Sequence, residues 1–416
     1  MIRLTTVIAL VASAMAMLFP ALMFGAPNLA NAAYSLLLVC AIVMLATQPR
    51  VRFTSLWQFI HANRWLCAAF VAVPLAVWFH EVWVRDWPPA VPYTYKRIGL
   101  FIVMTWLLMQ LPLAWLRAVR FGWMLGAAIA AIWITRMMLD SDGRQMHIGF
   151  SNLIPFGDLS MMMGVLALLS IGWTRSRVSV VLGVLAGLLG LYVSVASGNR
   201  GSWLAIPIFI FIALFLTRRW STRVKFGVYA AVIATLVLLG AVSRPIAERV
   251  ERVDDELTQF EHGENLDSSV GTRLQLWQAS WRIFQRHPVA GTGVLEFKDA
   301  LHEEAAQNRL TPVAATFDHS HNEVLFALAS LGVVGLLAYL MLLVVPAVFY
   351  ARRLRADNPQ VRCTAAMGLT LCTGFAVFGL TEVLTIITLT NAFYTITSAV
   401  LAADILQQER LAPSSA

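Results

Sequence analysis

A histidine at the edge of a long apolar run is the strongest chemical signal in the sequence. The stretch DHSHNEVLFALASLGVVGLL covers residues 318–337, and His321 stands where its polar start gives way to the apolar run. An imidazole, with an unperturbed pKa of about 6.5, suits a general base that takes a proton from a sugar hydroxyl. Asn322 and Glu323 follow directly and could orient the ring. The structural alternative is a histidine that caps an interfacial helix.

Two glycines follow on the expected helix. Gly332 comes 11 residues after His321, so at about 100° per residue it returns to within roughly 20° of the same direction. Gly335 lies about 40° to the other side. One helical face would then carry the histidine and, roughly 16 Å deeper, a smooth glycine patch. We expect another helix to pack closely against this patch.

Two arginine motifs could bind phosphate. Arg200 lies in SGNRGSW (197–203), a tight turn between two apolar runs, and a guanidinium matches phosphate oxygens in a bidentate way. Arg273 lies in GTRLQLW (271–277), in the first turn of an expected helix whose N–H groups also favour anions. The alternatives are an interfacial arginine bound to carbonyls or lipid headgroups for Arg200, and a solvated surface residue for Arg273.

A pair of acids is the candidate for a metal site. Asp140 and Asp142, with His147 nearby, are similar to the metal-binding carboxylates of many sugar transferases. Two acids in a glycine-containing loop are also common by chance. We therefore predict that the protein uses no metal.

The composition sets the environment in which these groups act. The chain has 416 residues, of which 59% are hydrophobic and 13% charged, and its mean hydropathy is +0.70. A soluble protein of this length carries roughly 25% charged residues. This excludes a soluble enzyme, a disordered chain and a secreted disulfide scaffold. We predict an all-α polytopic membrane protein.

Twelve apolar runs could cross the membrane. They cover about 5–24, 29–47, 65–84, 98–116, 121–138, 153–172, 178–194, 202–217, 226–243, 322–349, 361–380 and 384–406. Alternate loops then place 17 basic and 3 acidic residues on one side, and 14 basic and 20 acidic residues on the other. By the positive-inside rule the basic side is cytoplasmic and holds both termini. The net charge of +8 is thus a signal of topology, and we expect no nucleic-acid partner.

A cleavable signal peptide over Met1–Ala33 is the alternative for the first run. That run has about 20 apolar residues, longer than the usual signal core of 7–15, which favours a membrane span. Cleavage would leave eleven spans with the same orientation.

The long segment 244–320 should form a helical loop on the outer side. Its first part repeats apolar residues at spacings of 4, 3, 4 and 3, at Ile246, Val250, Val253, Leu257 and Phe260. A second helix should begin after Ser268 or Ser269 and end at His287-Pro288, and a third should cover about 296–308. We expect three parts: spans 1–9 over 1–243, the loop over 244–320, and spans 10–12 over 321–416.

The ionisable residues of the spans lie at their outer ends rather than at the midplane, where transporters usually place them. These residues are Glu81, Arg136, Asp158, Arg200, Glu323 and Glu382. The arrangement suits a reaction at the lipid–water boundary better than passage across the membrane.

Taken together, the motifs resemble a known family. HN at 321–322, nine residues and then GVVG at 332–335 match the H-[NSQ]-x9-G-x-x-G signature of bacterial O-antigen ligases. The turn SGNRGSW resembles the first arginine motif of that family, and GTRLQLW resembles its second. The order of the motifs and the twelve-span plan agree with the family over the whole chain.

The resemblance implies a GT-C-like glycosyltransferase of the bacterial inner membrane that works on the periplasmic face. It would move O-antigen polysaccharide from undecaprenyl pyrophosphate to the lipid A-core oligosaccharide, with inversion and without a cofactor or metal. Arg200 and Arg273 would hold the pyrophosphate, and His321 would deprotonate or orient the acceptor hydroxyl. Asp318 and His319 match no catalytic role in the family but could support His321.

Two other kinds of protein remain open. O-antigen polymerases and protein O-oligosaccharyltransferases use the same lipid-linked donor and differ in the acceptor. The single large loop and the lack of a C-terminal soluble domain favour the ligase without excluding a polymerase. A transporter or flippase is the non-enzyme alternative, and the missing midplane charges count against it.

Overall fold

The computed structural model describes residues 2–84, 91–139, 153–174, 176–199, 201–216, 221–242 and 244–411. Every regular element in these ranges is a helix, so the predicted all-α polytopic class is confirmed. The predictions made for Asp140, Asp142, His147 and Arg200 fall outside the described residues.

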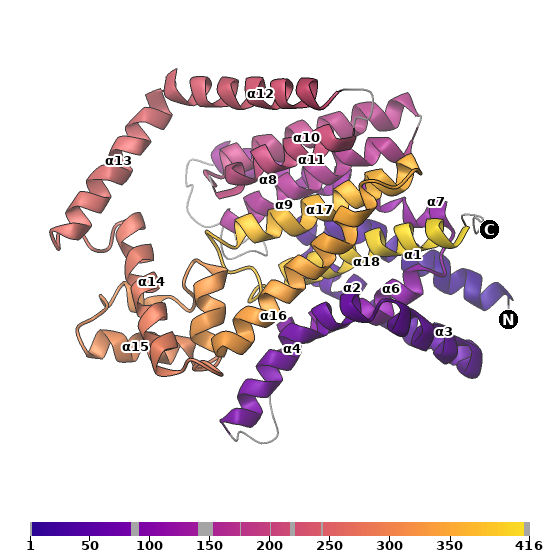
Figure 1. Cartoon of the computed structure of the whole chain (residues 1–416), viewed down its shortest axis with the longest axis horizontal. Coiled ribbons are helices and arrows are strands. Elements are labelled where there is room, and N and C mark those ends of the chain that lie inside the picture. Colours follow the sequence, from indigo (N-terminus) through magenta and orange to yellow (C-terminus); the bar gives the residue numbers. More distant parts are fainter. Residues whose placement is uncertain are drawn as a thin grey trace.

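Nine of the described helices are long and apolar enough to cross a membrane, and each coincides with a predicted span. They are α1 (Ile2–Gly25), α2 (Pro27–Thr47), α4 (Arg64–Trp83), α8 (Val119–Leu139), α9 (Leu153–Leu169), α10 (Arg177–Ala196), α16 (Glu323–Arg353), α17 (Pro359–Phe378) and α18 (Thr388–Leu411). Figure 1 shows that α1 begins and α18 ends on the same side of the bundle.

Of the other three predicted spans, two are divided into shorter helices and one is a single long helix. The run 98–116 is divided among α5 (Tyr93–Gly99), α6 (Phe101–Leu108) and α7 (Leu113–Leu116). Pro112 lies at this break, where it lacks an N–H and disfavours helix in the residue before it. The run 202–217 is a 3-10 turn, η2 (Gly201–Ala205), followed by α11 (Ile206–Leu216), and the run 226–243 is α12 (Thr222–Val242).

One helix was not expected. The chain between α2 and α4 forms α3 (Pro49–Ala62), which has Pro49 at its first position, where a missing N–H costs nothing. Its sequence is only weakly apolar and carries Arg50 and Arg52, so no helix was predicted there.

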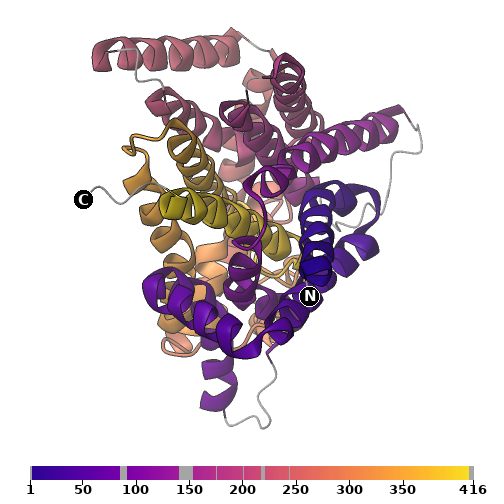
Figure 2. The ribbon, with the colours of Figure 1, turned by 90° about the vertical axis from the view of Figure 1, so that its right-hand side faces the viewer.

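The last helix, α18, is the centre of the bundle. Of its most apolar 18-residue window, 94% is buried, and Figure 2 shows it among the other helices. Arg117 secures one end of this helix, because its Nε donates to Oδ2 of Asp404 over 2.6 Å in the buried interior. The opposite end of α18 follows the loop 379–387, which contributes to the site described below.

Helix α16 is interrupted at Gly332, where φ is 66° and ψ is −159°. The free backbone groups at the interruption bond to the segment 288–293 of the long loop. Thr292 N donates to Ala329 O over 3.0 Å, and Gly293 N donates to Ser330 O over 2.8 Å. In return Val333 N donates to Pro288 O over 2.9 Å.

The expectation of a straight glycine face on this helix was therefore wrong. The helix is not continuous between His321 and Gly332, so the direction calculated at about 100° per residue does not apply. The segment packed against Gly332 is loop backbone rather than a helix. A side chain at Gly332 would overlap the carbonyl of Val289. We correctly predicted that another segment packs closely against Gly332, but that segment is the loop backbone and not the helix that we expected.

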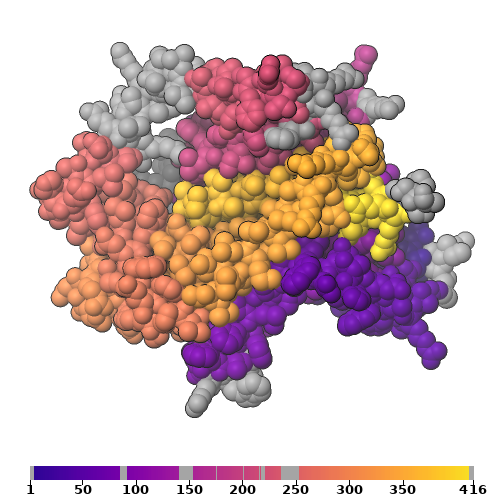
Figure 3. All heavy atoms as spheres, in the orientation of Figure 1, coloured from indigo at the N-terminus to yellow at the C-terminus, as the bar shows by residue number. Residues whose placement is uncertain are grey.

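The long loop contains the three helices that its sequence predicts. They are α13 (Arg244–Glu261), α14 (Ser269–Arg286) and α15 (Phe297–Ala306), and Ser268 caps α14 by accepting from Gly271 N over 3.0 Å. A short turn, η3 (Ala314–Thr316), follows. A separate apolar core joins α14 and α15 to α16 through Leu276, Phe297 and Phe326. Figures 1 and 3 show these loop helices at the end of the molecule away from the beginning of α1, the end we call the loop side.

Gly332→Ala should lower stability. A left-handed φ costs a residue with a Cβ about 1–2 kcal/mol, and the overlap with Val289 adds to this. We expect a clearly lower melting temperature in detergent. Gly227→Ala is the matched control, because a Cβ there meets nothing within 4 Å. Equal melting temperatures for both variants would contradict the interrupted helix.

Candidate active site

His321 lies immediately before α16 in a backbone conformation that histidine rarely adopts. Its φ is 51°, in the left-handed region, which costs a side-chain-bearing residue roughly 1–2 kcal/mol. Asn322 caps the helix that follows, since its Oδ1 accepts from Leu325 N over 3.0 Å. The histidine is 8% exposed. A strained backbone at the start of a membrane span is kept only where something compensates for its cost. The imidazole of His321 is therefore the reason we infer for this conformation.

A buried carboxylate joins His321 to a second histidine. Glu382 is 1% exposed and lies in the loop 379–387 between α17 and α18. Its Oε2 is 3.3 Å from Nδ1 of His321, and its Oε1 is 2.8 Å from Nε2 of His319. Nδ1 of His319 is in turn 2.6 Å from Oδ1 of Asp318. The four side chains form a continuous polar row from the exposed Asp318 to the buried His321.

The charges in this row follow from their surroundings. Burial alone would raise the pKa of Glu382, but its close contacts with His319 and His321 and the positive charge of His319 lower it to about 2. Burial would lower the pKa of His319, but its contacts with Asp318 and Glu382 raise it to about 9. At neutral pH the first group is therefore an anion and the second a cation.

Asn322 and Glu323 act on His321 indirectly. The carboxylate of Glu323 accepts from Leu384 N over 2.6 Å and from the N–H and hydroxyl of Thr385. Asn322 Nδ2 donates to Leu380 O over 3.2 Å. Neither side chain has a hydrogen bond to the ring of His321 among the described contacts. Both instead fix the loop that carries Glu382.

Arg273 is the arginine of α14 that the described fold leaves without a carboxylate. Its Nη1 donates to Oγ of Ser269 over 2.9 Å, and its buried Nε has no partner among the described residues. Arg282, Arg286 and Arg309, by contrast, converge on the buried Glu304 at 2.6, 2.5 and 2.7 Å. Those three hold α14, α15 and the chain after α15 together. No described contact joins Arg273 to His321.

Gly201, which follows Arg200, lies beside the same loop as Glu382, and Asn199, which precedes Arg200, contacts a buried acid of α9. Asn199 Nδ2 donates to Oδ1 of Asp158 over 2.7 Å, and a side chain at Gly201 would overlap Oγ1 of Thr381. Asp158 is fully buried in α9 and interacts electrostatically with Glu382. Its Oδ2 has no partner among the described residues. The first arginine motif is thus connected to the loop 379–387 through Gly201, and to Glu382 through Asn199 and Asp158.

Sequence reasoning missed the roles of Glu382 and Asp158. Both stood out only as acids at the outer ends of apolar runs. His321 and Glu382 are 61 positions apart, and no spacing rule links them. The signal available in the sequence was the rarity of an acid beside a membrane span.

The two histidines and Glu382 also need to be considered as a metal site. One ligand atom from each lies within 4.8 Å of the others. A metal requires neutral imidazole, whereas His319 is positioned between two carboxylates that keep it protonated. In the metal-free state these groups are arranged for ion pairing and proton transfer. Nδ1 of His321 faces Glu382, so Nε2 is the nitrogen left to receive a proton.

The fold and this row define a multi-pass membrane protein with a buried acid–base group at the loop side. Residues 185–340 match the family model described as O-antigen ligase, and that segment contains both arginine motifs and the histidine motif. The predicted resemblance is confirmed over this segment, which makes up less than half of the chain.

A curated relative gives no further functional information. Over 194 residues the chain is 23% identical to an uncharacterised protein of Haemophilus influenzae. The similarity covers 46% of this chain and 48% of the relative, so the match spans about half of the length of either protein.

The stability of the protein should fall in alkaline solution because of His319. A group whose pKa is raised on folding stabilises the fold fully below its unfolded pKa of about 6.5, and this stability is lost as pH rises through about 9. The loss should be on the order of 3 kcal/mol. Glu382, with a lowered pKa, loses its contribution only in acid and does not affect this range.

Melting temperatures between pH 6 and 10 test this assignment. His319→Gln should remove most of the alkaline slope, whereas His302→Gln, at an exposed histidine of α15, should retain it. An unchanged slope in His319→Gln would show that another group titrates.

Proposed function

We propose that this protein is an O-antigen ligase of the bacterial inner membrane with its site facing the periplasm. The donor is an undecaprenyl-pyrophosphate-linked glycan and the acceptor is lipid A-core oligosaccharide. The observation that carries the proposal is the buried His321–Glu382 pair at the loop side of α16, within the segment that matches the family. The excess of basic residues on the other side supports this orientation, with both termini cytoplasmic.

The reaction is a direct displacement. Nε2 of His321 takes the proton of the acceptor hydroxyl, whose oxygen attacks the anomeric carbon while the bond from that carbon to the pyrophosphate oxygen breaks. Inversion follows from a single attack. The anionic Glu382 stabilises the imidazolium that forms. The negative charge that develops on the leaving undecaprenyl pyrophosphate is stabilised by Arg273 and Arg200.

Energy for the transfer is present in the sugar–pyrophosphate bond, so the mechanism uses no nucleotide, and the two arginines supply the charge stabilisation that a metal could otherwise give. A polymerase that elongates the lipid-linked glycan, or a transferase to protein, would use the same groups with another acceptor. The acceptor is therefore what the experiment must identify.

Arg200→Ala, Arg273→Ala and His321→Ala should each abolish detectable transfer while the protein remains folded in membranes. Loss of a general base costs about 10²–10⁴ in rate, and loss of one charge-stabilising donor costs about 10²–10³. The measurement is transfer in vitro with purified protein, undecaprenyl-pyrophosphate glycan and lipid A-core, read as a ladder of lipopolysaccharide.

His302→Ala is the control for this series, since that histidine is exposed on α15. Normal activity in two of the three site variants would show that the site is assigned wrongly. A growing lipid-linked glycan without a lipopolysaccharide ladder would identify a polymerase and leave the site in place.

A chelator should leave the rate of transfer unchanged within about twofold, because the proposed chemistry is proton transfer and charge stabilisation by side chains. The assay in excess EDTA, with and without added Mg²⁺, measures this directly. Strict dependence on a divalent ion would instead favour a metal held by Asp140 and Asp142 or by the two histidines and Glu382.

A further inference from the structure

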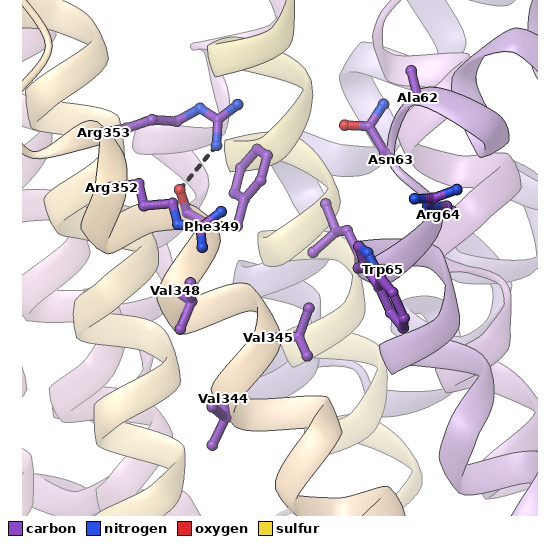
Figure 4. A pocket seen from close by; sticks show the side chains of 11 residues that line it. Ala62, Asn63, Arg64, Trp65, Val344, Val345, Val348, Phe349, Arg352 and Arg353 are labelled. Atoms are coloured by element: carbon purple, nitrogen blue, oxygen red, sulfur yellow. Dashed lines mark hydrogen bonds between the residues drawn. The ribbon is translucent and has the colours of Figure 1, made fainter.

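A groove lies between the start of α4 and the last turns of α16, at the opposite end of α16 from His321. It encloses about 540 Å³. One wall is made by residues 62–66 at the junction of α3 and α4, and the other by residues 344–353 of α16. Figure 4 shows the two walls, with the valines on the wall formed by α16.

The inside of the groove is apolar and open. Val344 and Val348 are 53% and 41% exposed, and Trp65 is 67% exposed. On a helix that crosses a membrane, such exposed aliphatic groups face hydrocarbon rather than water. The groove therefore offers a surface on which an acyl chain can lie, with an indole at the level where aromatic side chains meet lipid headgroups.

The rim of the groove is positively charged. Arg353 is neutralised, because its Nε and Nη2 donate to Glu409 over 2.7 and 3.0 Å. Arg352 has no ion pair among the described contacts. The guanidinium of Arg64 lies over the ring of Trp65, 5.8 Å from the ring centroid, and has no carboxylate partner among the described contacts. Among the residues that the structure describes, no carboxylate lines the groove. Two positive charges thus remain on opposite walls, as Figure 4 shows.

We propose that this groove binds one anionic glycerophospholipid, with its phosphate between Arg64 and Arg352 and an acyl chain along Val344, Val345 and Val348. The rim matches a phosphate and the interior matches a hydrocarbon chain, and a membrane lipid joins the two. The groove lies on the side that carries the excess of basic residues, where the leaflet is expected to be anionic. The site is distinct from the proposed transfer site and does not depend on it.

Native mass spectrometry of the delipidated full-length protein, titrated with phosphatidylglycerol or phosphatidylethanolamine, tests the proposal. The wild type should retain one phosphatidylglycerol about tenfold more tightly than phosphatidylethanolamine. Arg64→Gln/Arg352→Gln should remove this preference. The matched control is Arg50→Gln/Arg177→Gln, which removes two exposed arginines of the same basic side outside the groove and should keep the preference.

Three outcomes would overturn the proposal. They are equal retention of the two lipids by the wild type, an equal loss in the control, and equally tight binding of glycerol phosphate, which has no acyl chain. Val348→Trp provides an independent variant that keeps both charges and fills the groove. It should weaken retention of phosphatidylglycerol, and normal retention would contradict an acyl chain at this position.

Discussion

A carboxylate buried at the edge of the membrane is the constraint on which the loop side of this protein depends. Glu382 is almost inaccessible, and an unpaired buried charge would cost several kcal/mol. His319 and His321 pair with it from one side, and the loop that carries it is fixed by Glu323 and Asn322 from the start of α16. Pairing with Glu382 also explains why His321 is kept in a left-handed conformation, since the strained backbone directs its ring to the carboxylate.

The interruption of α16 joins the long loop to the membrane helices. A helix broken inside a bundle leaves backbone groups that must find partners, and here the loop segment 288–293 supplies them. The loop helices then form a small apolar core against the first part of α16. Because the same helix begins two residues after His321, one element sets the position of the loop and the position of the histidine.

The sequence allowed some of this to be predicted. Hydropathy located the spans, since every described long apolar helix coincides with a predicted run, and the spacing of 3 and 4 located the loop helices. Ser268 was one of two neighbouring serines expected to cap the second loop helix, and it is the one that does so. These features depend on neighbours in the chain, which a sequence displays directly.

The features that were missed depend on distant partners. The pairing of Glu382 with His321, the convergence of three arginines on Glu304 and the insertion of loop backbone at Gly332 all join residues far apart in the sequence or on different elements. Helix α3 was missed for another reason, because its weak hydropathy resembles that of a loop.

The transfer rate of Glu382→Gln shows whether the buried carboxylate takes part in the reaction. The amide keeps the size of the side chain but removes the charge that would stabilise the imidazolium of His321. The account predicts a fall of about 10²-fold or more in transfer to lipid A-core, with donor binding and folding in membranes retained. Transfer at the wild-type rate would contradict it, because the buried carboxylate would then have only a structural role.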